Sequence, residues 1–280
     1  MEIAKQQNES AALRFFYGTV LGRLILKPLC MRWSSRLCGW FLDSGASKPL
    51  IRPFVRRHGI DLSEYVSEGF KSFNEFFSRK IKADRRPVVL DPSALIAPCD
   101  GLLSVYRVSG DTVIPVKQSR YTISSLLGGD SVSENYQNGI CLVFRLCVNH
   151  YHRYCYIDSG VKGENVFLPG KLHTVRPIAL EKFPVFTQNC REYTVIATEN
   201  FGDVVQMEVG AMLVGKIKNH HGPGDVRRGE EKGMFLYGGS TVIVLLEEGR
   251  AQLPEELYRA AEDRIETPVQ MGQRIGVKRE

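Results

Sequence analysis

The spacing of hydrophobic residues changes near residue 90. Between residues 11 and 42, apolar and aromatic side chains recur at the three-to-four-residue spacing of amphipathic helices. After Pro87 they alternate with polar residues or form short β-branched runs that end at Gly, Pro, Asn or Asp, which is typical of strands. The helical stripe contains Phe15, Phe16, Val20, Leu21, Leu24 and Ile25, and strands are predicted at 102–108, 112–116, 139–146, 154–157, 193–198, 204–209, 211–217 and 241–246.

Shorter helices are predicted on either side of the strands. Asp61 with Glu64, and Ser72 with Glu75, have the spacing of a capping box, and residues 253–264 form a polar helical pattern. Many short strands with little helix between them indicate a barrel or a sandwich. We therefore predict an α+β chain, with a helical, basic, membrane-associating region at 1–88 and a β-rich, barrel-like or sandwich-like catalytic domain at 89–280.

Positive charge is concentrated in the predicted helical region. The chain has 37 Lys and Arg against 31 Asp and Glu, a net charge of +6, and residues 10–60 alone hold nine basic residues and one acid. One interpretation is that the apolar stripe packs on the β-rich domain while the charges face water. The other is that the segment lies on an anionic membrane, with its apolar face in the interface and its cations near lipid phosphates.

The sequence has neither a predicted membrane-spanning helix nor a nucleic-acid-binding motif. The most apolar stretch is interrupted by Arg14, Arg23, Lys27 and Pro28, so no run reaches the roughly 18 residues of a spanning helix. Motifs of nucleic-acid-binding modules are missing as well, and we expect no nucleic acid partner. If the chain meets a membrane, we expect a peripheral association with the cytoplasmic face of the cell membrane.

The cysteines point to a reducing compartment. Seven cysteines without a Cys-x-x-Cys pair indicate reduced and mostly buried thiols in a chain of this length. Residues 1–10 are polar and do not resemble a secretory signal. Both features are typical of a chain that works in the cytoplasm.

Two segments bring reactive side chains together beside predicted strands. Ala97-Pro98-Cys99-Asp100-Gly101 places an acid directly before a strand, although an Asp-Gly turn is usually structural. Asn149-His150-Tyr151-His152-Arg153-Tyr154-Cys155 holds two imidazoles, a guanidinium and a thiol, and strand alternation puts His150 and His152 on one face. The second segment lacks an acidic ligand, so we expect no metal there.

A third segment, Tyr237-Gly238-Gly239-Ser240-Thr241, precedes an apolar strand. Its glycines leave the Gly239 carbonyl sterically open beside a serine hydroxyl, an arrangement that permits internal acyl chemistry. The segment does not match Gly-x-Ser-x-Gly, which disfavours a nucleophile elbow of the α/β-hydrolase kind.

Together these segments resemble the phosphatidylserine decarboxylases, pyruvoyl-dependent enzymes that make phosphatidylethanolamine. The resemblance spans about residues 70–250 and keeps the family's motifs in order, with Gly238 where many members have Leu. The motifs in this chain are Phe73-Asn74-Glu75-Phe76-Phe77-Ser78-Arg79 through Arg86-Pro87, Ala97-Pro98-Cys99-Asp100-Gly101, Tyr151-His152-Arg153, Val209-Gly210-Ala211 with Val214-Gly215, and Gly229-Glu230-Glu231-Lys232-Gly233 leading to Gly239-Ser240-Thr241.

The resemblance implies a precursor that cleaves itself. The Ser240 hydroxyl attacks the Gly239 carbonyl, an ester forms, and β-elimination leaves a pyruvoyl group, the covalent cofactor derived from Ser240, on the piece 240–280. That piece stays bound to the piece 1–239. The pyruvoyl carbonyl then forms a Schiff base with the amine of phosphatidylserine and accepts the electrons left by departing CO2. Asp100 matches the family's acid, which orients the base that serves Ser240.

One position departs from the family pattern. The family's Tyr-His-Arg-x-His motif ends in a histidine that is the usual base of self-cleavage, and this chain has Cys155 there. A thiol with a pKa near 8.5 is a poor base at neutral pH. The base is therefore His152, Cys155 or His173. We favour His152, because the chain keeps that part of the motif, and predict Asp100, His152 and Ser240 as the catalytic residues.

Two alternatives to a phosphatidylserine decarboxylase stay open. One is a pyruvoyl-dependent decarboxylase that acts on a soluble amino acid. The other is a lipid-binding scaffold that is never cleaved. The basic, apolar N-terminal region favours a phospholipid substrate at an anionic membrane surface, and Cys155 alone supports the scaffold. The sequence leaves open the acyl-chain preference and whether two copies form a homodimer.

Overall fold

The computed structural model describes residues 11–66, 69–109, 112–116, 119–180, 183–211, 216–236 and 240–279. Its N-terminal part is helical, as predicted. The Thr19 hydroxyl accepts a hydrogen bond from the Gly22 amide and begins the second helix, and Gly59, at φ +60°, ends the fourth. The elements are α1 (Ala11–Gly18), α2 (Val20–Leu29), α3 (Arg32–Asp43), the 3₁₀ helix η1 (Gly45–Leu50), α4 (Ile51–His58), the 3₁₀ helix η2 (Leu62–Glu64), β1 (Tyr65–Val66), α5 (Phe73–Phe77) and β2 (Lys80–Ile81).

Both predicted capping residues begin helical turns. The Ser72 hydroxyl accepts a hydrogen bond from the Glu75 amide at 3.2 Å and begins α5. Asp61 accepts from the Ser63 amide at 2.9 Å, but the turn that it begins is only the 3₁₀ helix η2. The Glu75 carboxylate bonds to the Lys71 amide.

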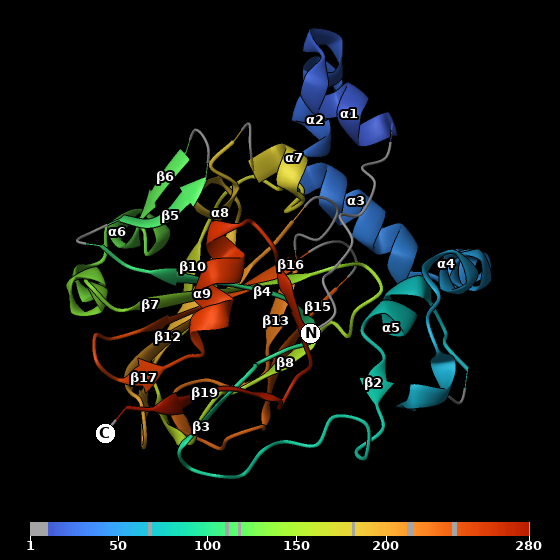
Figure 1. Ribbon diagram of the computed structural model, residues 1–280. Helices are drawn as coiled ribbons and strands as arrows, with labels where there is room; N and C mark the ends of the chain where they lie inside the picture. The colour runs from blue at the N-terminus through green and yellow to red at the C-terminus, as the bar shows by residue number, and fades with distance from the viewer. Residues whose placement is uncertain are drawn as a thin grey trace.

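A nine-stranded sheet forms the centre of the molecule (Figure 1). Its described strands do not close into a barrel, and smaller sheets beside it give a sandwich-like arrangement. The order of the large sheet is β14 (Gly224–Val226), β9 (Gly160–Lys162), β11 (Arg191–Thr198), β12 (Gly202–Val209), β16 (Ser240–Leu246), β7 (Ile140–Leu146), β4 (Gly101–Arg107) and β18 (Thr267–Val269), with β10 (Val166–Leu168) also beside β11. Every pair in this sheet is antiparallel.

The remaining elements cover this sheet. The small sheets are β13 (Ile217–Asn219), β15 (Glu231–Phe235) and β8 (Arg153–Cys155); β17 (Ala251–Gln252), β19 (Arg274–Lys278) and β3 (Ala94–Ile96); and β5 (Thr112–Val116) with β6 (Ser119–Thr122). The other helices are α6 (Ile123–Leu126), the 3₁₀ helix η3 (Ser131–Tyr136), α7 (Pro177–Leu180), α8 (Val185–Gln188) and α9 (Glu255–Glu262). The strands predicted in the β-rich part are present within two residues of their bounds, except 211–217. Residues 212–215 lie outside the described residues, and β13 starts at Ile217.

Strand alternation divides the core into two layers. In β16, Val242, Val244 and Leu246 enter one buried cluster together with the small sheet β13-β15-β8. Ile243 and Leu245 enter a second cluster on the opposite face, under α6 and α8. Because β16 is buried on both faces, its sequence is a continuous apolar run.

The N-terminal helices are anchored to the β-rich part at two places. Tyr17, Leu26 and Cys30 of the α1–α2 region pack against Val175 and Ala211, among others. The aromatic residues of α5 pack against a cluster that includes Tyr151. Away from these anchors, α1 and α2 stand clear of the sheets (Figure 1).

An ion pair lies in the interior of the sandwich. Lys232 on β15 donates to the Glu208 carboxylate on β12 at 2.6 Å, and both side chains are fully buried. Asn219 bonds to both partners, accepting from Lys232 at 3.1 Å and donating to Glu208 at 3.1 Å. The pair therefore links the small sheet to the large one at the cost of desolvating two charges.

We expect Lys232→Met to destabilise the fold by about 3–5 kcal/mol, because it leaves the Glu208 carboxylate buried without its counter-ion. The double variant Glu208→Gln with Lys232→Met removes both charges and keeps an acceptor for Asn219, so it should recover most of that loss. Chemical denaturation midpoints of the two variants test this. A double variant no more stable than the single one would mean that the interior does not need charge balance at this position.

Candidate active site

Two of the residues that the sequence predicted as catalytic, Asp100 and Ser240, lie at one end of the large sheet. Asp100 directly precedes β4, and Ser240 is the first residue of β16. Between them runs β7, whose last residue, Leu146, is the register partner of Ser240. Two inter-strand spacings separate Asp100 from Ser240, roughly 10 Å, which leaves room for one side chain between them. Gly239, Gly238 and Tyr237 lie outside the described residues.

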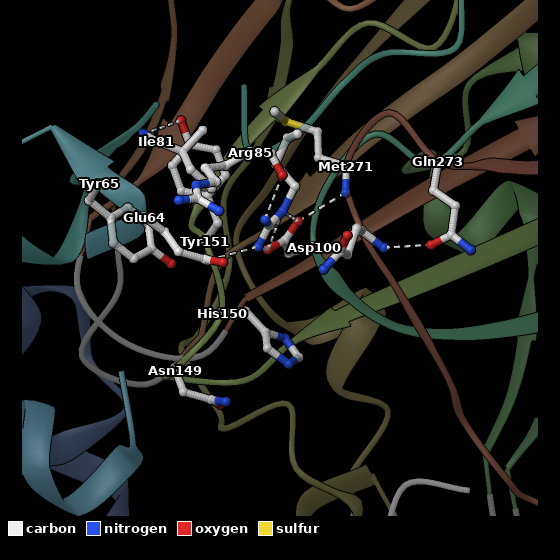
Figure 2. Close-up of polar contacts among 12 residues, drawn as sticks. Glu64, Tyr65, Ile81, Arg85, Asp100, Asn149, His150, Tyr151, Met271 and Gln273 are labelled. Carbon is white, nitrogen blue, oxygen red and sulfur yellow. Dashed lines mark hydrogen bonds and ion pairs between the residues drawn. The ribbon is translucent and has the colours of Figure 1, made fainter. Parts of the chain in front are cut away.

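Asp100 is held by an arginine and a backbone amide. Arg86 donates from Nε and Nη2 to the carboxylate at 2.7–3.1 Å, and the Met271 amide donates to Oδ1 at 2.9 Å. Glu64 lies 3.7 Å from the same guanidinium. Figure 2 shows Asp100 at the centre of these contacts, with His150 drawn nearby and no marked bond between the two. None of the hydrogen bonds that Asp100 makes to described residues goes to a histidine.

His150 follows β7 in the loop that leads to β8. Its Nδ1 accepts a hydrogen bond from the Cys147 amide at 3.0 Å. Burial lowers the pKa of His150 to about 4, and the Asp100 carboxylate opposes that shift. The structure therefore places His150, two residues before the predicted base, in the field of Asp100.

His152 is fully buried and has one free ring nitrogen. Its Nδ1 lies 2.9 Å from the His150 carbonyl, so Nδ1 carries the proton and Nε2 keeps its lone pair. Nε2 has no hydrogen-bond partner among the described residues, and the ring packs on Phe77 at 4.0 Å between centroids. Burial, followed by the charge of Arg79, holds the pKa of His152 well below its usual value. The imidazole is neutral at physiological pH.

The backbone of His152 is tied to the strand that leads to Ser240. The Phe235 amide at the end of β15 donates to the His152 carbonyl at 2.9 Å. Ser240 follows five residues later in the chain, is fully buried, and its Oγ lacks a partner among the described residues. A buried hydroxyl and a buried imidazole nitrogen are thus both unpaired in this part of the molecule, which is uncommon for buried polar atoms.

The two alternative bases have different surroundings. Cys155 lies in the apolar core, and burial raises the pKa of its thiol to about 12, so it stays protonated at neutral pH. His173 stacks on Phe183 at 4.6 Å, and its Nδ1 lies 3.5 Å from Cys30 Sγ. It packs where the N-terminal helices meet the β-rich part, and it has no described contact with Ser240 or Asp100.

Three features of this region were not predicted. The sequence showed Arg86 in a family motif but did not reveal that it binds Asp100. Arg79 is buried at 2% exposure against the loop that carries His150. The Glu208–Lys232 pair lies on the face of the sheet toward which Ser240 points, because Glu208 is opposite Val242. No group of His, Cys, Asp and Glu in the described part of the chain is arranged to hold a metal ion.

Comparison with known proteins is consistent with this arrangement of motifs. The sequence model of a family described as phosphatidylserine decarboxylase matches residues 73–277. This chain belongs to the phosphatidylserine decarboxylase family. It is 41% identical over 273 residues to "Phosphatidylserine decarboxylase proenzyme 2" of Clostridium acetobutylicum, covering 97% of this chain and 94% of that protein. It is 38% identical to the phosphatidylserine decarboxylase proenzyme of Clostridium botulinum strain Hall and 37% identical to that of Clostridium beijerinckii, in each case over 95% of this chain and 92% of the relative.

The family match and the alignments with the relatives differ in how far they extend toward the N-terminus. The phosphatidylserine decarboxylase match begins at the first residue of α5 and includes Asp100, His152 and Ser240. Helices α1–α4 lie before the match, but the aligned region of the relatives extends over nearly the entire chain. The sequence of the N-terminal region therefore lies largely within the part of the chain that aligns with these clostridial relatives.

Buried neutral histidines make the fold sensitive to acid. The pKa values of His150 and His173 are held at about 4, and that of His152 is also lowered. A folded-state pKa below the unfolded value of about 6.5 means that the unfolded chain binds protons more readily as the pH falls. We expect unfolding free energy to drop by about 1 kcal/mol per histidine between pH 7.5 and 5.5.

Urea unfolding of the Ser240→Ala chain at each pH measures this drop. His173→Phe keeps the stacking with Phe183 and should reduce the drop by about one histidine's share. A stability that is flat between pH 7.5 and 5.5 would contradict the neutral, buried state of these rings.

Proposed function

We propose that this chain is a phosphatidylserine decarboxylase made as a precursor that cleaves itself between Gly239 and Ser240. Membership of the family, and relatives named as proenzymes, support both the activity and the processing. Two buried atoms without a partner among the described residues carry the residue-level proposal. They are Ser240 Oγ, at the end of the sheet that also holds Asp100, and His152 Nε2, whose backbone carbonyl accepts from the Phe235 amide five residues before Ser240.

In this proposal His152 is the base. Its Nδ1 proton is committed to the His150 carbonyl, so Nε2 is the atom able to accept the Ser240 hydroxyl proton. Its low pKa makes the ring a weak base but keeps it unprotonated at neutral pH. The thiol of Cys155, with a pKa raised to about 12, is not a competitor.

The freed Ser240 oxygen attacks the Gly239 carbonyl carbon. The C–N bond breaks as the new C–O bond forms, so the amide becomes an ester and the residue 240 nitrogen is released as an amine. Loss of a proton from Cα of residue 240 expels the Gly239 carboxylate and leaves a dehydroalanine. Water then replaces its nitrogen, ammonia departs, and the pyruvoyl group remains on the segment 240–280.

Asp100 supports this reaction as a fixed negative charge. Arg86 and the Met271 amide hold its carboxylate beside the loop that carries both histidines, and its charge acts on His150. These contacts place two hydrogen bonds on each carboxylate oxygen and so occupy its about four acceptor sites, which leaves Asp100 to act on the histidines through its charge. We expect Asp100 to act on His152 through this loop.

The decarboxylation needs the pyruvoyl group, and the residues around Ser240 fit it. When present, its carbonyl supplies an electrophile for the substrate amine and an electron sink for the carbanion left by CO2. Ser240 lies in a buried and largely apolar strand, an environment that excludes water and favours loss of charge from a carboxylate. Its free Oγ is not used by any other contact of the described residues.

The N-terminal helices would deliver the lipid. Large apolar side chains on α2 and α3 are exposed. Most of the predicted stripe, Val20, Leu21, Leu24 and Ile25 included, is exposed as well, and, among the described residues, only Phe16 of the stripe packs in the cluster with Val175. Trp40 is 74% exposed, Val20 69%, Leu37 62% and Trp33 58%. Trp33, Leu37 and Trp40 recur at helical spacing on α3, within residues 10–60, which hold nine basic residues and one acid. Exposed tryptophans beside cations suit the interface of an anionic membrane.

Peripheral attachment of region 1–88 at the cytoplasmic face of the cell membrane follows as part of the proposal. No helix in the described part of the chain is long and apolar enough to cross a membrane. A soluble amino acid as substrate would leave this exposed apolar face without a role. The scaffold alternative rested on Cys155 alone, and a neutral His152 supplies the base that the thiol lacks.

We expect Ser240→Ala and His152→Ala to remain full-length chains without activity, because one lacks the nucleophile and the other the base. Asp100→Asn should slow cleavage at least tenfold, since the site loses its fixed charge. Denaturing electrophoresis over time, with mass spectrometry of the small chain for a pyruvoyl terminus, measures these outcomes.

Cys155→Ser is the matched control, because it keeps the size of the side chain and removes the thiol. It should cleave at close to the wild-type rate. Cleavage of His152→Ala at that rate would remove His152 from the proposal, and a stalled Cys155→Ser would assign the role to the thiol.

Replacing Leu37 and Trp40 with Ser should weaken binding to vesicles that contain phosphatidylglycerol at least tenfold, because two apolar side chains no longer enter the interface. Vesicle sedimentation at low and high salt measures binding. Leu90→Ser removes a side chain that is 76% exposed outside the helices and should change nothing. Equal losses in both variants would show that the effect does not belong to α3.

A further inference from the structure

Arg79 is a buried cation without a counter-ion. Its side chain, at the end of α5, is 2% exposed, and no carboxylate of the described residues lies within ion-pair distance. Arg145 and Arg228, by contrast, pair with Glu266 and Asp158. Burying a guanidinium without a carboxylate costs free energy, so other polar contacts must compensate for the charge of Arg79.

The guanidinium is directed at the loop that carries the histidines. Nη2 donates to the carbonyls of Asn149 at 3.2 Å and His150 at 3.3 Å, and to the Tyr65 hydroxyl at 3.2 Å. The cation also lies over the Tyr65 ring at 4.2 Å. Its Nε has no partner among the described residues.

Ser78, the residue before Arg79, bonds to the other side of the same loop. The Ser78 carbonyl accepts from Arg153 Nε at 2.8 Å, and Phe77 packs its ring on His152. The end of α5 therefore contacts the chain on both sides of His152, at residues 149–150 and at residue 153.

The His150 carbonyl is shared by two donors. It accepts from Arg79 Nη2 and also lies 2.9 Å from His152 Nδ1. A carbonyl oxygen has two lone pairs and can accept both bonds. Arg79 thus fixes the position of the one acceptor that decides which nitrogen of His152 carries the proton.

We propose that Arg79 is a positioning residue for self-cleavage, and that it acts by holding the His150 carbonyl against Nδ1 of His152. The inference rests on the proposed role of His152 as the base. With Nδ1–H held in this way, the Nε2 lone pair stays directed away from the loop and available for the serine proton.

The charge of Arg79 adds a second effect. Besides burial, the groups that lower the pKa of His152 are Arg79, which follows α5, and the His150 ring, while the bond to the His150 carbonyl favours protonation of His152. Removing the cation should raise the pKa of His152, so that the ring becomes protonated, and unable to act as a base, at a higher pH. The acid limb of the pH–rate profile, where the cleavage rate falls as the pH decreases, then moves to higher pH.

The test compares Arg79→Gln, which removes the charge, with Arg79→Lys, which keeps the charge but loses the planar fork. Self-cleavage of each full-length precursor is followed from pH 5 to 9. For Arg79→Gln we expect a rate at least tenfold lower near pH 6 and an acid limb shifted up by about one pH unit. For Arg79→Lys we expect a slower rate with the limb unmoved. Lys80→Ala changes the exposed neighbour and should match the wild type.

A second measurement does not depend on activity. In the Ser240→Ala precursor, ring nitrogen NMR should show His152 neutral with the proton on Nδ1. Adding Arg79→Gln should raise the pKa of the ring or mix the two tautomers. Arg79→Gln with a wild-type limb and an unchanged His152 spectrum would overturn the inference. If Arg79→Gln does not fold, an Arg79→Lys chain with the wild-type rate overturns it as well.

The two proposals fail separately. Normal cleavage by His152→Ala would refute the base itself. A stalled His152→Ala beside Arg79 variants of wild-type rate and pH profile would refute only the role of Arg79.

Discussion

The placement of β16 between two antiparallel neighbours is the constraint from which the site follows. It pairs with β7 along its whole length and with β12 from Thr241 onward, and all of its residues are buried. Ser240 is therefore at the point where double pairing begins, with a fixed backbone and a side chain that no ladder bond uses. The same pairing would retain the segment 240–280 after cleavage, together with β18 on β4 and β19 on β3. The Met271 amide of that segment also bonds to Asp100, so both pieces would build one site.

Much of the fold could be predicted because local spacing and burial agree. The nearly continuous apolar runs of β16 and β7 and the mixed apolar and polar runs of β4 and β12 are strong signals, and the structure has strands there. Three-residue strands such as β9 and β14 gave none, since they are defined by pairing with β11 and with each other. Residues 231–235 were also not predicted as a strand. Their Glu-Lys start is typical of a surface, yet Lys232 is buried because Glu208, 24 residues away, neutralises it.

The candidate site likewise contains residues that the sequence could predict and contacts that it could not. Asp100, His152 and Ser240 could be selected from their motifs, because reactive side chains next to turn residues are visible in a sequence. Their partners could not, because the decisive contacts join distant segments. Arg86 binds Asp100 across 14 residues, and Arg79 reaches the His150 carbonyl across 71. The tautomer of His152 also depends on a backbone carbonyl, which every residue has and which no sequence pattern distinguishes.

A series of packing contacts and hydrogen bonds joins the N-terminal helices to the sheet end. Tyr17 and Cys30 pack against the segment around His173 and Val175, and the Tyr17 hydroxyl accepts from the Thr174 amide at 3.2 Å. Asn189, which is fully buried, bonds in both directions to the backbone of His173 and donates to the Gly210 carbonyl at 2.7 Å. Gly210 follows Val209, the register partner of Thr241. Asn189 thus links the segment against which α1 and α2 pack to the strand beside Ser240. This makes the helices a part of the site's framework as well as its proposed contact with lipid.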